Sequence, residues 1–394
     1  MSGNTLLFIS TYILSVHLAL FVLWAVSVIM KFRVKIKAER TFPAERAYPF
    51  VSVIKPLKGT DVSLRENLES FFRQDYPGGF EIIFSVASDK DPCIETITGL
   101  KKAYPRIQSR LVVSEPLPSV IEKISNLESA LKNASADILI FADADVFLDS
   151  RDCLKKTIPY LEMPGIACVC AGYNQQYNAG DLISGLSAAY TNWGSFCLQL
   201  LNQYDNYLFL GGFWCVKRGV LDKIGGFTGL GGYISEDFSL ARKIIEGLKL
   251  KCVFMLDTVK ISSRKISFGE WRQQIRRYLV SCKLVSPLLL QMVFSIFSIS
   301  CFIGFIYFAF FSTEPWSGLF STVLFTAYLL RVMPVAAFYA LQNRMRINPY
   351  FLLLPIIDIL SIIEALAFLF GRHIIWKGKK YRMRLNGRIK AVME

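Results

Sequence analysis

The sequence predicts an α/β domain with a mostly parallel sheet, placed between apolar segments at the two ends of the chain. Between residues 49 and 283, runs rich in branched and aromatic residues alternate with runs of helical spacing. Such alternation is typical of parallel strands joined by helices. The run 137–141 is almost continuously apolar, as expected of a strand that is buried on both faces. The whole chain is 53% hydrophobic with a mean hydropathy of +0.38, which is too apolar for an ordinary soluble domain.

The elements of the first half follow one another in a regular order. The first run of strand formers stops at the turn Lys55-Pro56-Leu57-Lys58-Gly59, and the first helical run ends before Tyr76-Pro77. We expect strands at 50–57, 81–87, 110–114 and 137–141, with helices at 64–73, 94–102 and 124–132. Because ligands bind beyond the carboxyl ends of the strands in such sheets, polar residues that follow these strands are candidates for the site.

The second half of the domain is less regular. An apolar run at 208–216 contains Gly211 and Gly212, and a glycine-rich stretch at 229–232 precedes an expected helix at 238–247. Glycine lets the backbone approach a ligand closely or adopt positive φ. Either role is open to the glycines of these stretches.

The N-terminal segment predicts a membrane anchor. Residues 5–30 carry no acidic or basic side chain other than His17, and a helix of that length can cross the ~30 Å hydrocarbon layer. A cleaved signal peptide is disfavoured, because no positive residue precedes the run and no small-residue cleavage site follows it. The basic residues that come next predict that residues 49–283 face the cytosol: Lys31, Arg33, Lys35, Lys37 and Arg40.

The C-terminal third is apolar again, with expected spans at 286–312 and 322–341. Asp358 and Glu364 interrupt a third apolar run at 350–371. A full span there would place the basic tail on the far side of the membrane, against the positive-inside rule, so a re-entrant or interfacial segment is favoured. The expected domains are an anchor and basic linker at 1–48, a catalytic domain at 49–283, and a membrane region with the tail at 284–394.

Composition excludes several function classes. The net charge of +14 could suggest nucleic acid, but much of the excess flanks apolar segments, where basic residues meet lipid headgroups, and no nucleic-acid motif accompanies it. The nine cysteines form no CxxC pair, which argues against a structural zinc site. The two histidines, His17 and His373, lie outside residues 49–283. Catalysis in that segment therefore falls to carboxylates.

The strongest candidate motif is Asp143-Ala144-Asp145, which follows the apolar strand 137–141. Side chains alternate along an extended chain, so Asp143 and Asp145 point the same way. Hard oxygen ligands of this kind suit Mg²⁺ or Mn²⁺ shared with substrate phosphates. Alone the motif is weak evidence, because Asp-x-Asp also occurs in solvated turns.

Three further groups each have an ordinary structural alternative. Asp91, or equally Asp89, could be a loop residue or a helix cap. Glu236 and Asp237 could be acids of a first helical turn, or Asp237 could take a proton from an acceptor hydroxyl. The basic stretch from Gln274 to Tyr278 could simply flank a membrane segment, or Arg276 or Arg277 could face a pyrophosphate.

Taken together, these motifs resemble the ceramide glucosyltransferase family, within the glycosyltransferases of GT-A fold. The resemblance runs from the N-terminal anchor to Tyr278 and reappears in the tail. It is carried by the turn at 55–59, Gln74-Asp75-Tyr76-Pro77, Asp91-Pro92, Lys123 with Asn126-Leu127, Asp143, Tyr233-Ile234-Ser235-Glu236-Asp237 and the tail Trp376-Lys377-Gly378-Lys379-Lys380-Tyr381-Arg382.

The resemblance implies a role for each matching residue. Asp91 would contact the base or ribose region of the nucleotide, Asp143 with Asp145 would hold Mg²⁺ or Mn²⁺ and the diphosphate, and Asp237 would be the general base. Gln274 and Arg277 would bind the diphosphate or help to close the site. Further substrate contacts are expected from Lys55, Glu236, Arg276 and Tyr278.

The sequence departs from the family pattern at two positions. Tyr278 stands where the family's closing motif has Trp after Arg, and Asp145 is an acid that the animal ceramide enzymes lack. Bacterial relatives that glycosylate hopanoid lipids share much of the motif set, which leaves the acceptor open.

The expected activity is inverting transfer of a hexose from a UDP-sugar to the primary hydroxyl of a membrane lipid. The favoured sugar is glucose, and the favoured lipid is ceramide. The alternatives are another lipid acceptor such as a hopanoid, or a processive polysaccharide synthase. The resemblance also implies an integral membrane protein, in the bacterial inner membrane or the Golgi according to its source.

Overall fold

A computed structural model describes most of the chain between residues 48 and 391. The described residues are 48–117, 121–202, 210–233, 235–263, 265–283, 299, 303–313, 315, 317–343, 348–371, 373–376, 379–383 and 388–391. The expected anchor at 5–30 and the basic linker lie outside them, as does most of the expected span at 286–312. The chain divides into two compact units, Pro43–Leu288 with Ile363–Glu394, and Met1–Phe42 with Leu289–Ile362.

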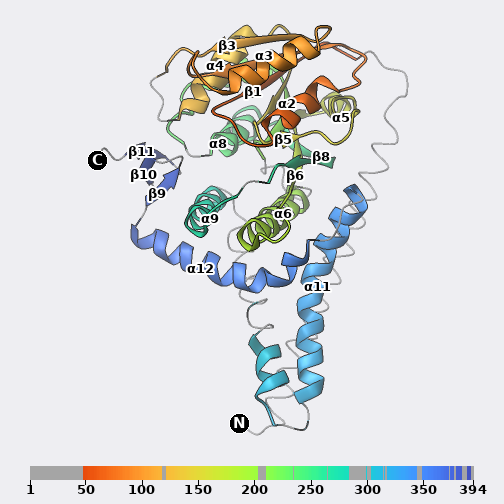
Figure 1. Ribbon diagram of the computed structural model, residues 1–394, viewed down its shortest axis with the longest axis vertical. Coiled ribbons are helices and arrows are strands. Elements are labelled where there is room, and N and C mark those ends of the chain that lie inside the picture. Colours follow the sequence, from red (N-terminus) through yellow and green to blue (C-terminus); the bar gives the residue numbers. More distant parts are fainter. Residues whose placement is uncertain are drawn as a thin grey trace. The chain divides into compact units, whose positions relative to one another are not determined.

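The larger unit is built on an eight-stranded sheet (Figure 1). Its strands lie in the order β3-β2-β1-β4-β7-β6-β8-β5. Its first half is parallel and alternates with helices, as the sequence predicts. In chain order the elements are β1 Val51–Pro56, α2 Leu64–Phe72, β2 Phe80–Val86, α3 Cys93–Ala103, β3 Gln108–Val113, α4 Glu122–Asn133 and β4 Ile138–Ala142. Strands β1, β2 and β4 are buried along their whole length, and their sequences are accordingly mostly apolar.

The second half completes the sheet with mixed pairing. Strand β7 is antiparallel to β4 and β6, β6 is parallel to β8, and β8 is antiparallel to β5. The strands are β5 Val146–Phe147, β6 Ile166–Gln175, β7 Phe213–Lys217 and β8 Lys251–Ile261. The helices are α5 Cys153–Thr157, η1 Ile158–Glu162, α6 Leu182–Asn202, α7 Arg218–Lys223, α8 Glu236–Arg242, η2 Lys243–Gly247 and α9 Phe268–Lys283. The helix expected at 238–247 therefore begins two residues earlier and ends in the π-helical η2.

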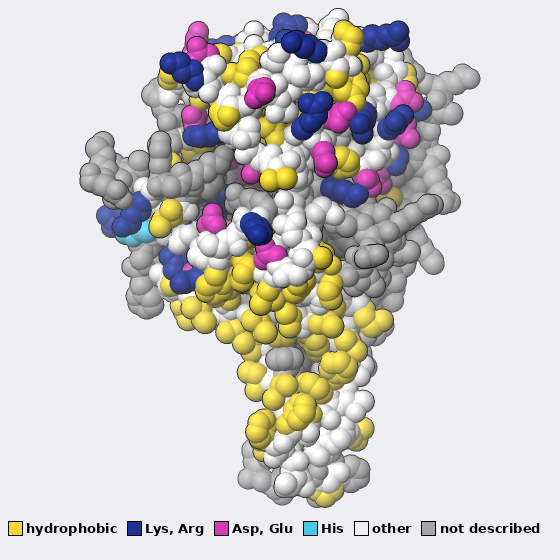
Figure 2. All heavy atoms as spheres, in the orientation of Figure 1, with side chains coloured by type: hydrophobic (Ala, Val, Ile, Leu, Met, Phe, Trp, Pro, Cys, Tyr) yellow, Lys and Arg dark blue, Asp and Glu magenta, His cyan; other side chains and the backbone are white. Residues whose placement is uncertain are grey.

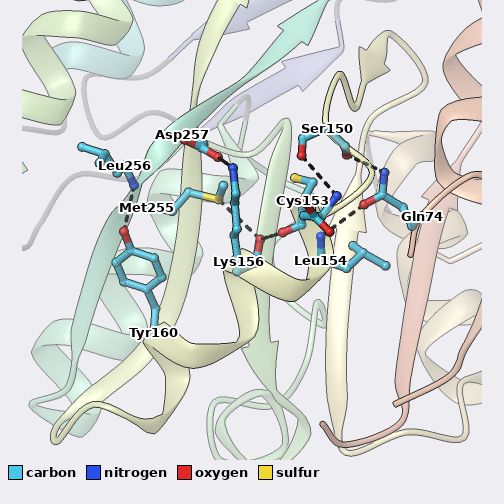
Figure 3. Close-up of polar contacts among 11 residues, drawn as sticks. Gln74, Ser150, Cys153, Leu154, Lys156, Tyr160, Met255, Leu256 and Asp257 are labelled. Atoms are coloured by element: carbon cyan, nitrogen blue, oxygen red, sulfur yellow. Dashed lines mark hydrogen bonds and ion pairs between the residues drawn. The ribbon is translucent and has the colours of Figure 1, made fainter. Parts of the chain in front are cut away.

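Buried polar contacts fix the segment after the Asp143 motif to the sheet (Figure 3). The Gln74 amide donates to the Ser150 carbonyl over 2.9 Å and accepts from the Leu154 amide over 3.2 Å. The Tyr160 hydroxyl accepts from the Leu256 amide on β8 over 2.9 Å (Figure 3). Gln74, part of the family-like motif, thus has a structural role beneath α5.

The C-terminal tail forms a small antiparallel sheet within the larger unit. It consists of β9 His373–Trp376, β10 Lys379–Met383 and β11 Ile389–Ala391 in the order β11-β10-β9. An isolated bridge pairs Tyr233 with Arg388, so the tail meets the segment that leads into α8.

The smaller unit contains the helix α11 Ser317–Asn343, which covers the expected span at 322–341, and η3 Pro349–Leu353. Helix α12 Leu354–Gly371 crosses the boundary between the units. In the part of the chain that the structure describes, no helix is both long and apolar enough to cross a membrane.

Candidate active site

A small pocket lies at the carboxyl end of β4, inside the larger unit. Its lining combines a lysine, three carboxylates and an aromatic floor, and includes Lys123, Asp143, Gly211, Trp214, Glu236 and Asp237. The floor is a packed aromatic cluster, in which Trp214 stacks on Phe141 with ring centroids 4.2 Å apart. These packed rings form the apolar side of the pocket.

Lys123 joins two of the carboxylates. Its ammonium lies 2.7 Å from Asp143 Oδ1 and 2.7 Å from Glu236 Oε1. Desolvation alone would lower the pKa of Lys123, but these two carboxylates raise it overall, so the lysine stays charged. Burial likewise opposes ionisation of Glu236, yet Lys123, with a further contribution from Arg277, lowers the pKa of Glu236. Lys123 and Glu236 are therefore both charged.

Asp237 behaves differently from its neighbour. Its Oδ2 accepts from the Gly211 amide over 3.0 Å, and its Oδ1 accepts from its neighbour Phe238's amide over 2.9 Å. Burial, followed by repulsion from Glu236, raises the pKa of Asp237 to about 7. A carboxylate tuned to this range suits general-base chemistry near neutral pH.

Two glycines make room for the polar groups. A Cβ at Gly211 would lie 2.8 Å from Asp237 Cβ, and a Cβ at Gly212 would lie 2.8 Å from Tyr173 Cε1. Both distances are shorter than real Cβ contacts allow, so glycine is required for this packing. Gly211 and Gly212, from the glycine-containing run at 208–216, thus lie against Asp237 and Tyr173.

Asp143 and Asp145 follow β4 directly, beside Lys55 of β1. The buried Lys55 ammonium donates to the Asp143 carbonyl over 2.9 Å, which fixes the backbone of the motif. Burial lowers the pKa of Lys55 to about 7, against the attraction of the two aspartates. Although the Asp145 side chain reaches solvent, desolvation and then repulsion from Asp143 raise its pKa.

The two aspartates fit a divalent ion of the Mg²⁺ type. Among the described residues no group of three or more His, Cys, Asp or Glu side chains could hold a metal ion. A two-carboxylate site nevertheless suits Mg²⁺ or Mn²⁺, because such ions usually complete their coordination with water and substrate phosphates. The repulsion between Asp143 and Asp145 is the electrostatic situation that a bound cation relieves.

Tyr173 of β6 brings a hydroxyl to the same place. Its oxygen accepts from the Gly212 amide over 2.6 Å. Burial, with the negative charges of Asp143 and Asp237, raises the pKa of Tyr173 far above its usual value, so the phenol stays protonated. Nothing in the sequence pattern around Tyr173 separates it from a core aromatic.

Asp91 lies in the loop after β2 and holds the turn that follows β1. Its carboxylate accepts from the Gly59 amide over 3.0 and 3.1 Å and from the Cys93 amide over 3.0 Å. These bonds join the family-like turn at 55–59 to the start of α3. Asp91 therefore has the helix-capping contact that its ordinary alternative predicts, and it also shapes the neighbouring loop.

Helix α9 separates the residues of the stretch from Gln274 to Tyr278. Gln274 accepts from the Ser187 hydroxyl over 3.2 Å, and Tyr278 stacks on Tyr190 with centroids 6.0 Å apart, so both contact α6. Arg276 forms an ion pair with Glu364 of α12. Arg277 lies over the Tyr278 ring, 5.5 Å from its centroid, and its charge acts on Glu236.

The structure thus brings Asp143, Glu236 and Asp237 into one pocket, with Asp145 and Lys55 beside it. Of the two arginines left open by the sequence, Arg277 is the one whose charge acts on a pocket residue, whereas Arg276 pairs with Glu364. The sequence-based site lacks Lys123, Tyr173 and Gly211. Lys123 stands among the family-like motifs, which was the one signal available for it.

Comparison with known proteins gives the family. A model of glycosyl transferase family 21 matches residues 8–389, so the chain belongs to that family. It is similar to ceramide glucosyltransferase 3 of Caenorhabditis elegans, with 27% identity over 57% of this chain and 49% of the relative. It is also similar to ceramide glucosyltransferase 1 of the same organism, with 26% identity over 57% of this chain and 48% of the relative. The resemblance that the motifs carry is confirmed.

The chain spans about half the length of the curated relatives that it matches. Among solved structures it is similar to a mannosyltransferase from Pyrobaculum calidifontis in complex with GDP-Man and Mn²⁺, with a TM-score of 0.49 and 16% identity over 90% of this chain and 99% of the other. The S. aureus TarS fragment 1–349 gives a TM-score of 0.40 and 13% identity over 88% of this chain and 99% of the other.

Proposed function

We propose that this protein transfers a hexose from a UDP-sugar to the primary hydroxyl of a membrane lipid, with inversion at the anomeric carbon. The hexose that we propose is glucose, and the lipid is ceramide. The observation that carries this proposal is Asp237, a carboxylate with a pKa raised to about 7 in the same pocket as Asp143. Membership in glycosyl transferase family 21 and the ceramide glucosyltransferase relatives support the class of reaction.

In this mechanism Asp237 takes the proton from the acceptor hydroxyl. The hydroxyl oxygen forms a bond to the anomeric carbon as the bond from that carbon to the UDP oxygen breaks on the opposite face. An α-linked donor then gives a β-glycoside and UDP. The Gly211 amide fixes the orientation of the Asp237 carboxylate, and the Glu236 charge keeps its basicity high.

Negative charge gathers on the departing diphosphate. In this proposal Arg277 receives that charge, and Lys123 offsets the negative charge of Asp143 and Glu236 beside it. A Mg²⁺ or Mn²⁺ ion held by Asp143 and Asp145 would supply Lewis-acid stabilisation of the same charge. Lys55 keeps the backbone of that motif in register.

An amphipathic helix supports a lipid acceptor and a membrane location. Along α12, Ile356, Ile359, Ile363 and Leu366 are between 41% and 53% exposed and recur at spacings of three and four residues, so they share one face. Figure 2 shows hydrophobic side chains gathered over this helix. Such a face suits the interfacial segment expected at 350–371, with the catalytic unit on the cytosolic side.

The decisive test is a product assay. The purified full chain is incubated with UDP-glucose, UDP-galactose or UDP-N-acetylglucosamine and with ceramide, diacylglycerol or a hopanoid in mixed micelles, and products are identified by mass. One hexose on ceramide, from UDP-glucose, supports the proposal. A polymer made without lipid, or no sugar transfer to any lipid, would contradict it.

A further inference from the structure

Glu364 is a fully buried carboxylate on α12, a mostly apolar helix that also contains Asp358. Its exposed fraction is 0%, and both of its oxygens are engaged: Oε1 accepts from Arg272 Nε and Oε2 from Arg276 Nε. The two arginines stand four residues apart, on one side of α9. Glu364 thus forms ion pairs with two successive turns of α9, on one face of that helix.

The other sides of α9 have their own contacts within the larger unit. Trp271 and Ile275 are buried, Gln274 and Tyr278 contact α6, and the Gln273 amide oxygen accepts from the Ile375 amide of β9 over 3.0 Å. The rotation of α9 about its axis is therefore set by α6, β9 and Glu364 together. Arg277 lies on the same side of the helix as Gln273, four residues further on.

We propose that Glu364 is a positioning residue for the donor site, holding α9 in the rotation that presents Arg277 to the diphosphate. This inference rests on the proposed function, in which Arg277 binds that group. Arg276 and Arg277 are adjacent, so their side chains leave the helix about 100° apart. Because Arg276 pairs with Glu364, the direction in which the Arg277 side chain leaves the helix is fixed as well.

The charges of Glu364 and its two arginines make this contact directional. A buried carboxylate that accepts from two guanidinium groups forms charge-assisted bonds, which are stronger and more directional than neutral ones. Glutamine at 364 would keep the volume but lose the charge, and it would leave two arginines without their counter-ion. We expect α9 then to turn slightly about its axis, because only its contacts with α6 and β9 still set its rotation, while the buried Trp271 and Ile275 keep the helix in place.

The experiment is a binding cycle with UDP as the probe. Equilibrium dissociation constants are measured for the parent chain, Glu364→Gln, Arg277→Gln and the double variant. We expect each single change to weaken UDP binding about tenfold, the size of one charge-assisted contact. The double variant is expected to bind no more weakly than Arg277→Gln alone, because Glu364 acts through Arg277.

Two further variants complete the test. Glu270→Gln removes a carboxylate from the same helix that accepts from the Ser267 amide and hydroxyl, and this variant is expected to bind UDP as the parent does. Arg276→Gln leaves Glu364 its bond to Arg272, so it carries the same comparison if Glu364→Gln does not fold. Melting temperatures measured in parallel separate loss of folding from loss of binding.

The outcomes distinguish this inference from the proposed function. If Arg277→Gln weakens UDP binding while Glu364→Gln and Arg276→Gln do not, Glu364 is only a structural residue and the inference is wrong. Additive losses in the double variant would also overturn it. If Arg277→Gln binds UDP as the parent does, Arg277 leaves the donor site, and that part of the proposed function fails with the inference.

Discussion

The Gly211 amide donates to Oδ2 of Asp237 over 3.0 Å, and a Cβ at position 211 would stand 2.8 Å from the Asp237 Cβ. The proposed base is thus oriented by a backbone position that tolerates no side chain. Gly211 both orients the Asp237 carboxylate and leaves room for it. A change at Gly211 therefore tests the role of Asp237 without altering the chemistry of its carboxyl group.

Gly211→Ala is expected to displace the Asp237 carboxylate and to lower turnover at least tenfold, because a general base must lie within hydrogen-bond reach of its proton. UDP binding should change little, since Asp143 and Arg277 are not displaced. Steady-state kinetics and UDP binding measured side by side check this. Gly219→Ala is the matched control, because nothing lies within 4 Å of a Cβ there. Equal turnover in both variants would contradict the prediction.

The pH profile tests Asp237 directly. Because its pKa is raised to about 7, the carboxyl group is protonated and inactive as a base below that pH and ionised above it. Turnover should therefore rise with pH through about 7 and fall about tenfold per pH unit well below it. Asp237→Asn should lose about 10²–10⁴-fold in turnover, the usual contribution of a general base, while still binding UDP. A profile that stays flat between pH 5.5 and 8 would exclude this residue.

The sequence predicts the first half of the sheet well. Strands β1, β2 and β4 are apolar runs that end at turn residues, and each lies within two residues of its expected bounds. Local pattern suffices there, since both faces of each strand are buried and the intervening helices have clear apolar spacing. The second half mixes parallel and antiparallel pairing, and the strands β6 and β8 are not among the elements expected from the sequence.

The site is predicted only where its residues follow a strand or share a motif. Asp143 and Asp237 stand at such places, whereas Lys123 reaches Asp143 from α4 only because that helix packs against the sheet. Tyr173 is one aromatic among many along the sequence, and its role depends on pairing between β6 and its neighbours. Arg276 and Arg277 are adjacent in the sequence, and only their contacts distinguish them: Arg276 pairs with Glu364, whereas the charge of Arg277 acts on Glu236.

Lys123→Met is expected to shift the pH profile to higher pH. The positive charge of Lys123 lowers the pKa of Asp237, against the burial and Glu236 repulsion that raise it. Its removal therefore lets the pKa of Asp237 rise further, and the rising limb of the profile should move with it. Lys123→Arg keeps the charge and should leave the limb near its parental position. The prediction is wrong if both variants shift the pH profile equally, or if neither variant shifts it.

The last prediction concerns the divalent ion. If Asp143 and Asp145 both hold it, a chelator should abolish transfer, and Mn²⁺ or Mg²⁺ should restore it, since both ions seek oxygen ligands. Asp145→Ala should raise the metal concentration needed for half-maximal activity, and calorimetric titration with Mn²⁺ should show correspondingly weaker binding.

The matched control is Asp149→Ala, an exposed aspartate four residues further on that pairs with Lys260. Its metal requirement should equal that of the parent chain. If Asp145→Ala instead keeps full activity at low metal, Asp145 is a surface acid and the ion rests on Asp143 alone, as in the animal ceramide enzymes that lack the second acid. We expect the metal-dependent outcome, because repulsion from Asp143 already raises the pKa of Asp145, beyond the effect of desolvation, and a cation between them relieves that repulsion.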